Sequence, residues 1–202
     1  MKQNEETRRA TVERRTRETD ITLSLAIPSL EESAIQSGVP FFDHMLSAMT
    51  RHGRFHMNLQ CDGDYEVDDH HSVEDIGLCL GKALKEALGE KRGITRFGDA
   101  TVPMDDALAT VAIDLSGRPF FRYEGMELQG YVGRYSEELT PEFLRSMATT
   151  GEMNLHVKVH YGSNRHHIHE AIFKALGIAL YKAMAIDPFL QEEILSTKGT
   201  IV

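Results

Sequence analysis

The sequence predicts an α+β protein made of two copies of one unit, and three observations support this. Residues 69–84 (DHHSVEDIGLCLGKAL) resemble residues 165–180 (RHHIHEAIFKALGIAL) at a constant offset of 96 positions. Both segments carry apolar residues at helical spacing, and stretches of alternating apolar and polar residues precede both. Such internal similarity indicates a duplicated unit. We therefore expect each half, residues 1–93 and 94–202, to form a small sheet backed by helices.

Each half is expected to run strand, strand, short helix, strand, long helix. In the first half, residues 20–27 and 55–60 alternate as strands do, and residues 41–49 (FFDHMLSAM) form the short helix. The long helix begins at the first histidine pair. Its apolar face consists of Ile76, Leu80, Ala83, Leu84, Ala87 and Leu88.

The second half repeats this order. Residues 108–115 and 155–161 alternate, and residues 140–148 (TPEFLRSMA) predict a short helix with Thr140 as N-cap and proline in the first turn. Residues 125–133 are loop-like. The apolar face of the second long helix consists of Ile172, Leu176, Ala179, Leu180 and Ala183.

Composition and charge narrow the classes of function that the chain can have. The chain has 202 residues, of which 41% are hydrophobic, and its 22 basic against 31 acidic residues give a net charge of −9. It can bury a core, and its acidic balance argues against a nucleic-acid partner but allows a small anionic substrate. The absence of a membrane-length apolar run predicts a cytoplasmic protein without a membrane partner. Cys61 and Cys79 are expected to be reduced thiols.

The histidine pairs predict metal sites. His70 and Glu74 lie four positions apart on the expected helix, His71 and Glu74 three apart, and the second helix repeats this pattern with His166, His167 and Glu170. Imidazole with carboxylate suits manganese, iron, cobalt or zinc, of which manganese is our first expectation. One such pair alone would be read as solvated or capping histidines. Two copies at one offset, both with the glutamate, favour metal.

Adjacent histidines on a helix diverge by about 100°, so the two members of a pair are expected to serve different ions. One ion would take His71 and Glu74 with His167, and the other His166 and Glu170 with His70. Two residues of the short helices are candidate fourth ligands, namely His44 and Glu142. Glu142 has the alternative role of an acid at a helix N-terminus.

A few basic and hydroxyl residues in loops could bind an anion. Arg96 and Arg118 each stand alone among Gly, Ser and Pro, and an STKG segment lies at residues 196–199. Surface charge is the alternative for each taken singly. The candidates are Arg96, Arg118, Ser196, Thr197 and Lys198, with His52 as a further substrate contact.

Together these motifs resemble the imidazoleglycerol-phosphate dehydratase family over nearly the whole chain. The residues that carry the resemblance are RxTxET at 14–19, FFDHML at 41–46, DDHHSVEDIG at 68–77, MDDALATVAIDLSGRP at 104–119, HHIHEAIFKALGIAL at 166–180 and STKG at 196–199. The resemblance implies duplicated units like domain 2 of ribosomal protein S5. It also implies a 24-subunit shell built from trimers, active sites between subunits, and two manganese ions per site.

The resemblance also implies roles for single residues. One ion would bind His44, His71, Glu74 and His167, the other His70, His166 and Glu170, and the loop candidates above would bind phosphate. Many relatives have histidine where this chain has Glu142. Two further departures are Ala48, in place of a polar substrate contact, and Leu195, in place of the usual proline before STKG.

The implied reaction removes water from D-erythro-imidazoleglycerol phosphate to give imidazole-acetol phosphate in histidine biosynthesis. The departing hydrogen has no adjacent carbonyl, so metal ions on the imidazole ring are expected to stabilise the negative charge. Glu18 is the expected proton shuttle or hydroxyl contact, with Glu74 and Glu170 as alternatives. Two other classes fit the metal pattern alone, namely a dinuclear metallohydrolase and a non-enzymatic protein that assembles around metal.

Overall fold

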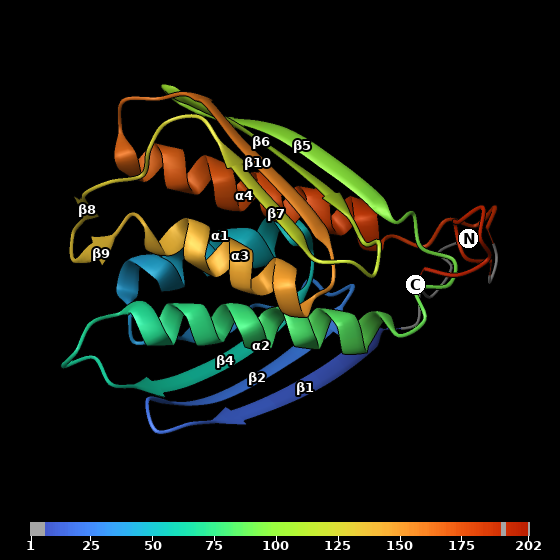
Figure 1. Ribbon diagram of the computed structural model, residues 1–202, viewed down its shortest axis with the longest axis horizontal. Helices are drawn as coiled ribbons and strands as arrows, with labels where there is room; N and C mark the ends of the chain where they lie inside the picture. Colours follow the sequence, from blue (N-terminus) through green and yellow to red (C-terminus); the bar gives the residue numbers. More distant parts are fainter. Residues whose placement is uncertain (1–6, 191–192, 202) are drawn as a thin grey trace.

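The computed structural model describes residues 7–190 and 193–201. The remaining residues of the two predicted halves, 1–6, 191–192 and 202, lie outside the described residues. Two four-stranded sheets enclose a layer of four helices (Figure 1). The predicted α+β class and its duplicated pattern are confirmed.

The two sheets have the same topology. The first has the order β1-β2-β4-β3 and the second β5-β6-β10-β7, and in each the short last strand is parallel to its neighbour while the other pairs are antiparallel. The strands of the first are β1 (Arg8–Arg15), β2 (Thr19–Ile27), β3 (Ala34–Gln36) and β4 (His56–Gly63). Those of the second are β5 (Phe97–Met104), β6 (Ala107–Asp114), β7 (Phe120–Glu124) and β10 (Asn154–Tyr161).

Each half contributes one short and one long helix. The first half contains α1 (Pro40–Gly53) and α2 (His70–Leu88), and the second contains α3 (Leu139–Thr150) and α4 (Arg165–Met184). The expected order of elements is incomplete, because each half has an additional short edge strand, β3 or β7, which is too short for a clear alternation. A two-stranded ribbon, β8 (Tyr131–Val132) with β9 (Tyr135–Ser136), begins inside the expected loop 125–133.

The predicted N-cap of α3 is wrong. The helix begins at Leu139, and the residue before it makes no capping hydrogen bond. The Thr140 hydroxyl is buried instead, 2.9 Å from the Tyr135 hydroxyl and 2.9 Å from Nδ1 of His169. Tertiary hydrogen bonding has therefore replaced the local cap.

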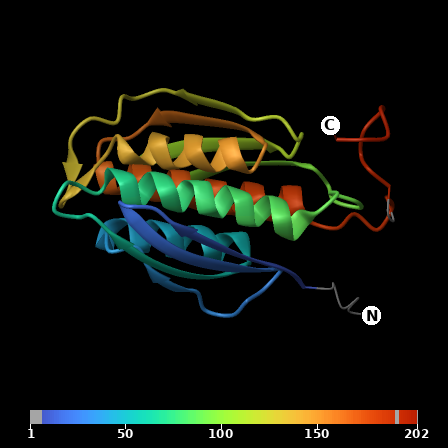
Figure 2. The ribbon, with the colours of Figure 1, turned by 60° about the horizontal axis from the view of Figure 1, so that its bottom comes forward.

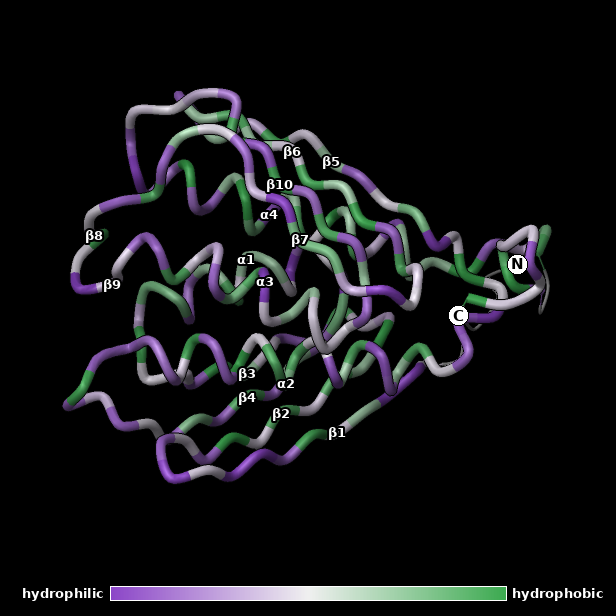
Figure 3. The backbone as a smooth tube through the Cα atoms, viewed as in Figure 1, coloured by the Kyte–Doolittle hydropathy of each residue, from purple (hydrophilic) through white to green (hydrophobic). Residues whose placement is uncertain are grey.

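The helices of the two halves exchange partners, in that each short helix packs against the long helix of the other half, and we call this arrangement crossed packing. The long helices α2 and α4 cover the first and second sheets, while α1 packs against α4 and α3 lies along α2 (Figure 2). Each short helix thus contacts the long helix of the other half. Residues of alternating hydropathy run along the strands (Figure 3). Buried residues alternate with more exposed ones in β2 and β6, so one face of each sheet turns apolar side chains toward the helices.

Two glycines at matching places of the repeat permit this crossed packing. A Cβ at Gly81 of α2 would overlap the Met147 carbonyl oxygen of α3, and a Cβ at Gly177 of α4 would overlap the Met49 carbonyl oxygen of α1. Both helix pairs therefore approach backbone to backbone. This close approach brings side chains of different halves together at the starts of the long helices.

Gly81→Ala is expected to destabilise the protein by about 1–3 kcal/mol, because the added methyl group must push α3 away from α2, although alanine is the better helix former. Urea unfolding monitored by circular dichroism measures the change. Lys82→Ala, at the next, exposed position of α2, is the control and is expected to shift stability by less than about 0.5 kcal/mol. Equal stabilities of the two variants would contradict the packing argument.

Candidate metal centres and anion pocket

Two groups of potential metal ligands lie at the starts of α2 and α4. In the first, His70 and Glu74 of α2 meet Glu142 of α3, and in the second, His166 and Glu170 of α4 meet His44 of α1. Within each group the ligand atoms lie within 4.8 Å of one another. We call them the α2 group and the α4 group.

The groups differ from the expected partition of ligands. Within one chain the structure brings His44 to His166 and Glu170, rather than to His71 and Glu74, and it brings His70 to Glu74 and Glu142. The cause is the crossed packing, because each short helix carries its ligand to the long helix of the other half. Glu142 does lie in the first turn of α3, but its carboxylate also faces His70 and Glu74.

Neighbouring cations keep two of these carboxylates ionised. The hydrogen bond and the charge of Arg145 lower the pKa of Glu142 against the opposing effect of burial. For Glu170, burial raises the pKa, but the hydrogen bond and charge of Lys174 at 2.8 Å, together with the charges of His44 and His166, make the net shift downward. Both carboxylates are therefore charged at neutral pH and available to a cation.

The second histidine of each pair points away from both groups. Nδ1 of His71 lies 2.9 Å from a carboxylate oxygen of Asp64, and Nδ1 of His167 lies 2.6 Å from one of Asp106. The hydrogen bond to Asp64 raises the pKa of His71. A carboxylate on Nδ1 fixes the ring and directs Nε2 outward, which is how metal-binding histidines are commonly held. Asp64 and Asp106 were not predicted, because neither lies in the segments 69–84 and 165–180 that match each other in sequence.

Glu18 lies beside the first of these outward-facing histidines. It stands at the tip of the β1–β2 hairpin with 54% of its side chain exposed, and its carboxylate is 3.9 Å from Nε2 of His71. The expected proton shuttle is thus next to an expected metal ligand, although not in the α2 group.

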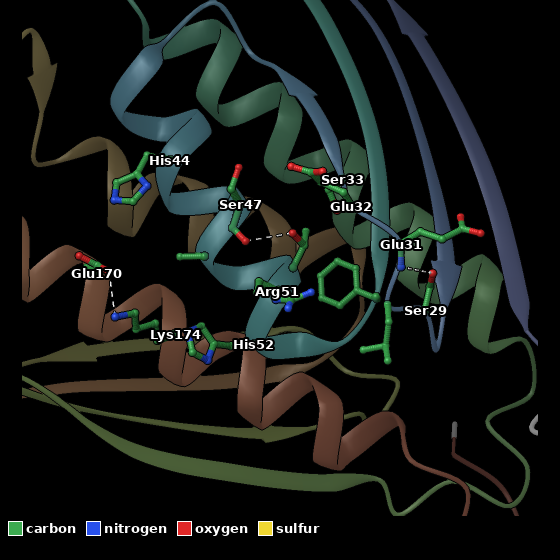
Figure 4. Close-up of a pocket in the computed structure, with 14 residues that line it drawn as sticks. Ser29, Glu31, Glu32, Ser33, His44, Ser47, Arg51, His52, Glu170 and Lys174 are labelled. Carbon is green, nitrogen blue, oxygen red and sulfur yellow. Dashed lines mark hydrogen bonds and ion pairs between the residues drawn. The ribbon is translucent and has the colours of Figure 1, made fainter. Parts of the chain in front are cut away.

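A pocket of about 700 Å³ opens beside the α4 group. Figure 4 shows His44 and His52 of α1 and Glu170 and Lys174 of α4 on its wall. Burial, together with the charge of Lys174, lowers the pKa of His52. Lys174 was missed by the sequence reasoning, although it follows Glu170 by one helical turn.

The five predicted anion-binding residues share a second pocket of about 650 Å³. It is lined by Arg96, Arg118, Ser196, Thr197 and Lys198, together with other residues of the C-terminal segment. Loops far apart in the sequence therefore meet here, as an anion site requires.

Arg96 is already partly engaged. Its guanidinium forks onto the Asp114 carboxylate at 2.7 and 3.2 Å, and Nη1 donates to the Leu195 carbonyl oxygen at 2.8 Å. Three of its five N–H donors are thus used within the chain, which leaves two for a ligand. Arg96 holds the segment that carries the other hydroxyl and ammonium groups.

The anion pocket and the α4 group lie at opposite ends of α4. The Arg96 amide donates to the carbonyl of Ala183, and Ala183 is 13 residues from Glu170 on α4, which is about 20 Å along the helix axis. A single chain therefore does not bring its α4 group and its anion pocket to one small substrate.

The chain is similar to known proteins over most of its length. A family model described as imidazoleglycerol-phosphate dehydratase matches residues 37–180. The chain belongs to this family. The dehydratase of Geobacillus sp. (strain WCH70) is 52% identical over 194 residues, covering 96% of this chain and 99% of the relative. That of Leptospira biflexa is 52% identical over 188 residues, covering 93% and 95%.

Solved imidazoleglycerol-phosphate dehydratases share the fold. The Staphylococcus aureus structure has a TM-score of 0.80 and 34% identity, covering 89% of this chain and 99% of that one. The Pyrococcus furiosus structure, in complex with (S)-C348, has a TM-score of 0.80 and 35% identity, covering 94% and 99%. Family membership makes the chain a hydro-lyase of histidine biosynthesis. Among the described residues, no helix is long and apolar enough to cross a membrane.

Arg96→Ala is expected to release the C-terminal segment, because it removes the hydrogen bond to the Leu195 carbonyl. Amide hydrogen exchange within residues 193–201 should become at least about tenfold faster. Arg118→Ala is the matched control, since Arg118 lines the same pocket and hydrogen-bonds to Ser116 rather than to the segment. Unchanged exchange in Arg96→Ala would show that other contacts hold the segment.

Proposed function

We propose that this dehydratase removes water from imidazoleglycerol phosphate in a manganese-dependent reaction that gives imidazole-acetol phosphate. The observation that carries the proposal is the presence of two separate His/Glu groups together with an anion pocket in one fold. A phosphorylated imidazole offers ring nitrogens to metal ions and a phosphate to basic residues. Membership of the family gives the proposal its reaction class.

The donor atoms fit manganese. The α4 group offers two imidazoles and one carboxylate, and the α2 group one imidazole and two carboxylates. Both cysteines lie outside these groups, and Cys79 is buried. Nitrogen and oxygen donors without thiolate favour manganese, iron, cobalt or zinc over copper(I). Bound manganese would supply positive charge that stabilises an anionic imidazole ring while the hydroxyl departs.

The remaining steps fall to side chains of the chain itself. The Glu18 carboxylate is exposed, stands beside Nε2 of His71 and is free to move a proton to or from the substrate. Glu74 and Glu170 belong to the ligand groups and are the alternative carriers. Arg118, Lys198 and the hydroxyls of Ser196 and Thr197 would bind the phosphate, with Arg96 ordering their segment.

We further propose that each active site is shared between copies of the chain. The outward-facing Nε2 atoms of His71 and His167 would complete the ligand groups of a neighbour, and the anion pocket of another copy would bind the phosphate. The separation of pocket and α4 group along one helix supports this arrangement. It agrees with the 24-subunit shell of trimers that the family resemblance implies.

Chelator-stripped protein is expected to convert imidazoleglycerol phosphate to the imidazole-acetol phosphate ketone only after manganese is added. His166→Ala should reduce this turnover by more than about 100-fold, because the α4 group loses a ligand. His156→Ala, an exposed histidine of β10, should keep it. Release of inorganic phosphate without ketone would favour the metallohydrolase, and metal binding without either product would favour the assembly protein.

Two inactive variants are expected to complement each other if sites are shared. Co-expressed Glu170→Gln, which damages the α4 group, and Arg118→Ala, which damages the anion pocket, should together recover up to about a quarter of wild-type turnover, because some mixed sites contain neither change. Glu170→Gln with His166→Ala is the control and should recover nothing, since both changes damage the same group. No recovery in the first pair would refute shared sites.

A further inference from the structure

The tip of the β1–β2 hairpin is built by the RxTxET motif at residues 14–19. The strands pair up to Arg15 and Asp20, so Thr16 and Glu18 lie in the turn. The Thr16 hydroxyl accepts the backbone N–H groups of Glu18 and Thr19 at 3.0 and 2.9 Å. This side chain therefore fixes the backbone on which Glu18 stands.

A buried carboxylate ties this tip to α2. One oxygen of Asp75 accepts from Nη2 of Arg14 on β1 at 2.9 Å, and the other accepts from the Thr19 hydroxyl on β2 at 2.5 Å. Asp75 is only 5% exposed. Asp75 thus hydrogen-bonds to both strands of the hairpin, on either side of Glu18. Glu74, the preceding residue, turns to the α2 group instead.

The repeat does not account for Asp75. The matching position of α4 is Ala171, and the β5–β6 hairpin is held in the opposite way, by its own Asp106, which accepts the backbone N–H groups of Ser163 and Asn164 before α4. The ion pair is also a weak source of stability, because the desolvation of buried Asp75 offsets its attraction to the half-buried Arg14. The carboxylate on α2 therefore calls for a local role in the first half.

We propose that Asp75 is a positioning residue that holds the Glu18 carboxylate beside Nε2 of His71. The inference rests on the proposed role of Glu18 in proton transfer. Arg14 and Thr19 act through the same carboxylate, and Thr16 fixes the turn, so three residues of the RxTxET motif serve to place Glu18. Misplacement of a reacting group by about 1 Å can cost 100-fold in rate.

Asp75→Asn tests this, because it keeps the size of the side chain but removes its charge. The manganese-loaded enzyme is expected to lose roughly 10- to 100-fold in kcat with KM changed less than about twofold. In the Glu18→Gln background the same change should cause no further loss. Hydrogen exchange of the amides of residues 16–19 in the metal-free protein should become about tenfold faster. Bound manganese per chain should stay unchanged.

Asp20→Asn is the matched control, since it removes an exposed ion pair of the same hairpin with Arg15 and should alter neither kcat nor exchange. If Asp75→Asn does not fold, Thr19→Val removes one of the two bonds and should show the same effects more weakly. The inference would be overturned if Asp75→Asn left amide exchange at the tip unchanged. It would also be overturned if Asp75→Asn lowered kcat as much in the Glu18→Gln background as in the wild type. A wild-type chain without dehydration would refute the proposed function alone, because the exchange comparison needs no turnover.

Discussion

The site depends on the crossed packing of the helices. Each ligand group takes residues from a long helix of one half and a short helix of the other, so its geometry is set by how closely these helices approach. Gly81 and Gly177 remove the side chains that would keep the backbones apart. Had each short helix packed on its own half's long helix, His44 and Glu142 would exchange partners, and the two groups would have a different composition.

The sequence predicted the helices more accurately than it predicted which residues of different helices contact one another. The 96-residue offset and the helical spacing predicted both long helices with the histidines and glutamates at their starts, and helical spacing also predicted both short helices, which carry His44 and Glu142. The pairing of His166 with Glu170 agrees with the structure because it is local to one helix, whereas Glu74 lies within one chain beside His70 rather than beside the expected His71. The third member of each group depends on a contact between halves, and nothing in the local pattern states which half supplies it. The prediction of Thr140 as an N-cap was wrong for the same reason, since its hydroxyl hydrogen-bonds to His169, which is distant in the sequence.

The carboxylates behind the outward-facing histidines show how one geometry arose from unlike sequences. His71 is held by Asp64 from the loop before α2, whereas His167 is held by Asp106 from a hairpin turn. A search for repeated motifs cannot find such residues, because only the position of the carboxylate relative to the ring is repeated. Asp106 was nonetheless inside the MDDALATVAIDLSGRP segment that carried the family resemblance, and its acidic side chain was the available signal.

The exchange of short helices has a consequence for symmetry. A chain of half this length could cover its long helix and close a ligand group only by pairing with a second copy about a twofold axis, and its two groups would then be identical. Joining the halves in one polypeptide removes that requirement. The two groups of this chain have in fact diverged, with His44 in one and Glu142 in the other, so they differ by one unit of negative charge. The linked chain therefore presents two ligand groups of unequal charge, which a symmetric pair of identical halves cannot do.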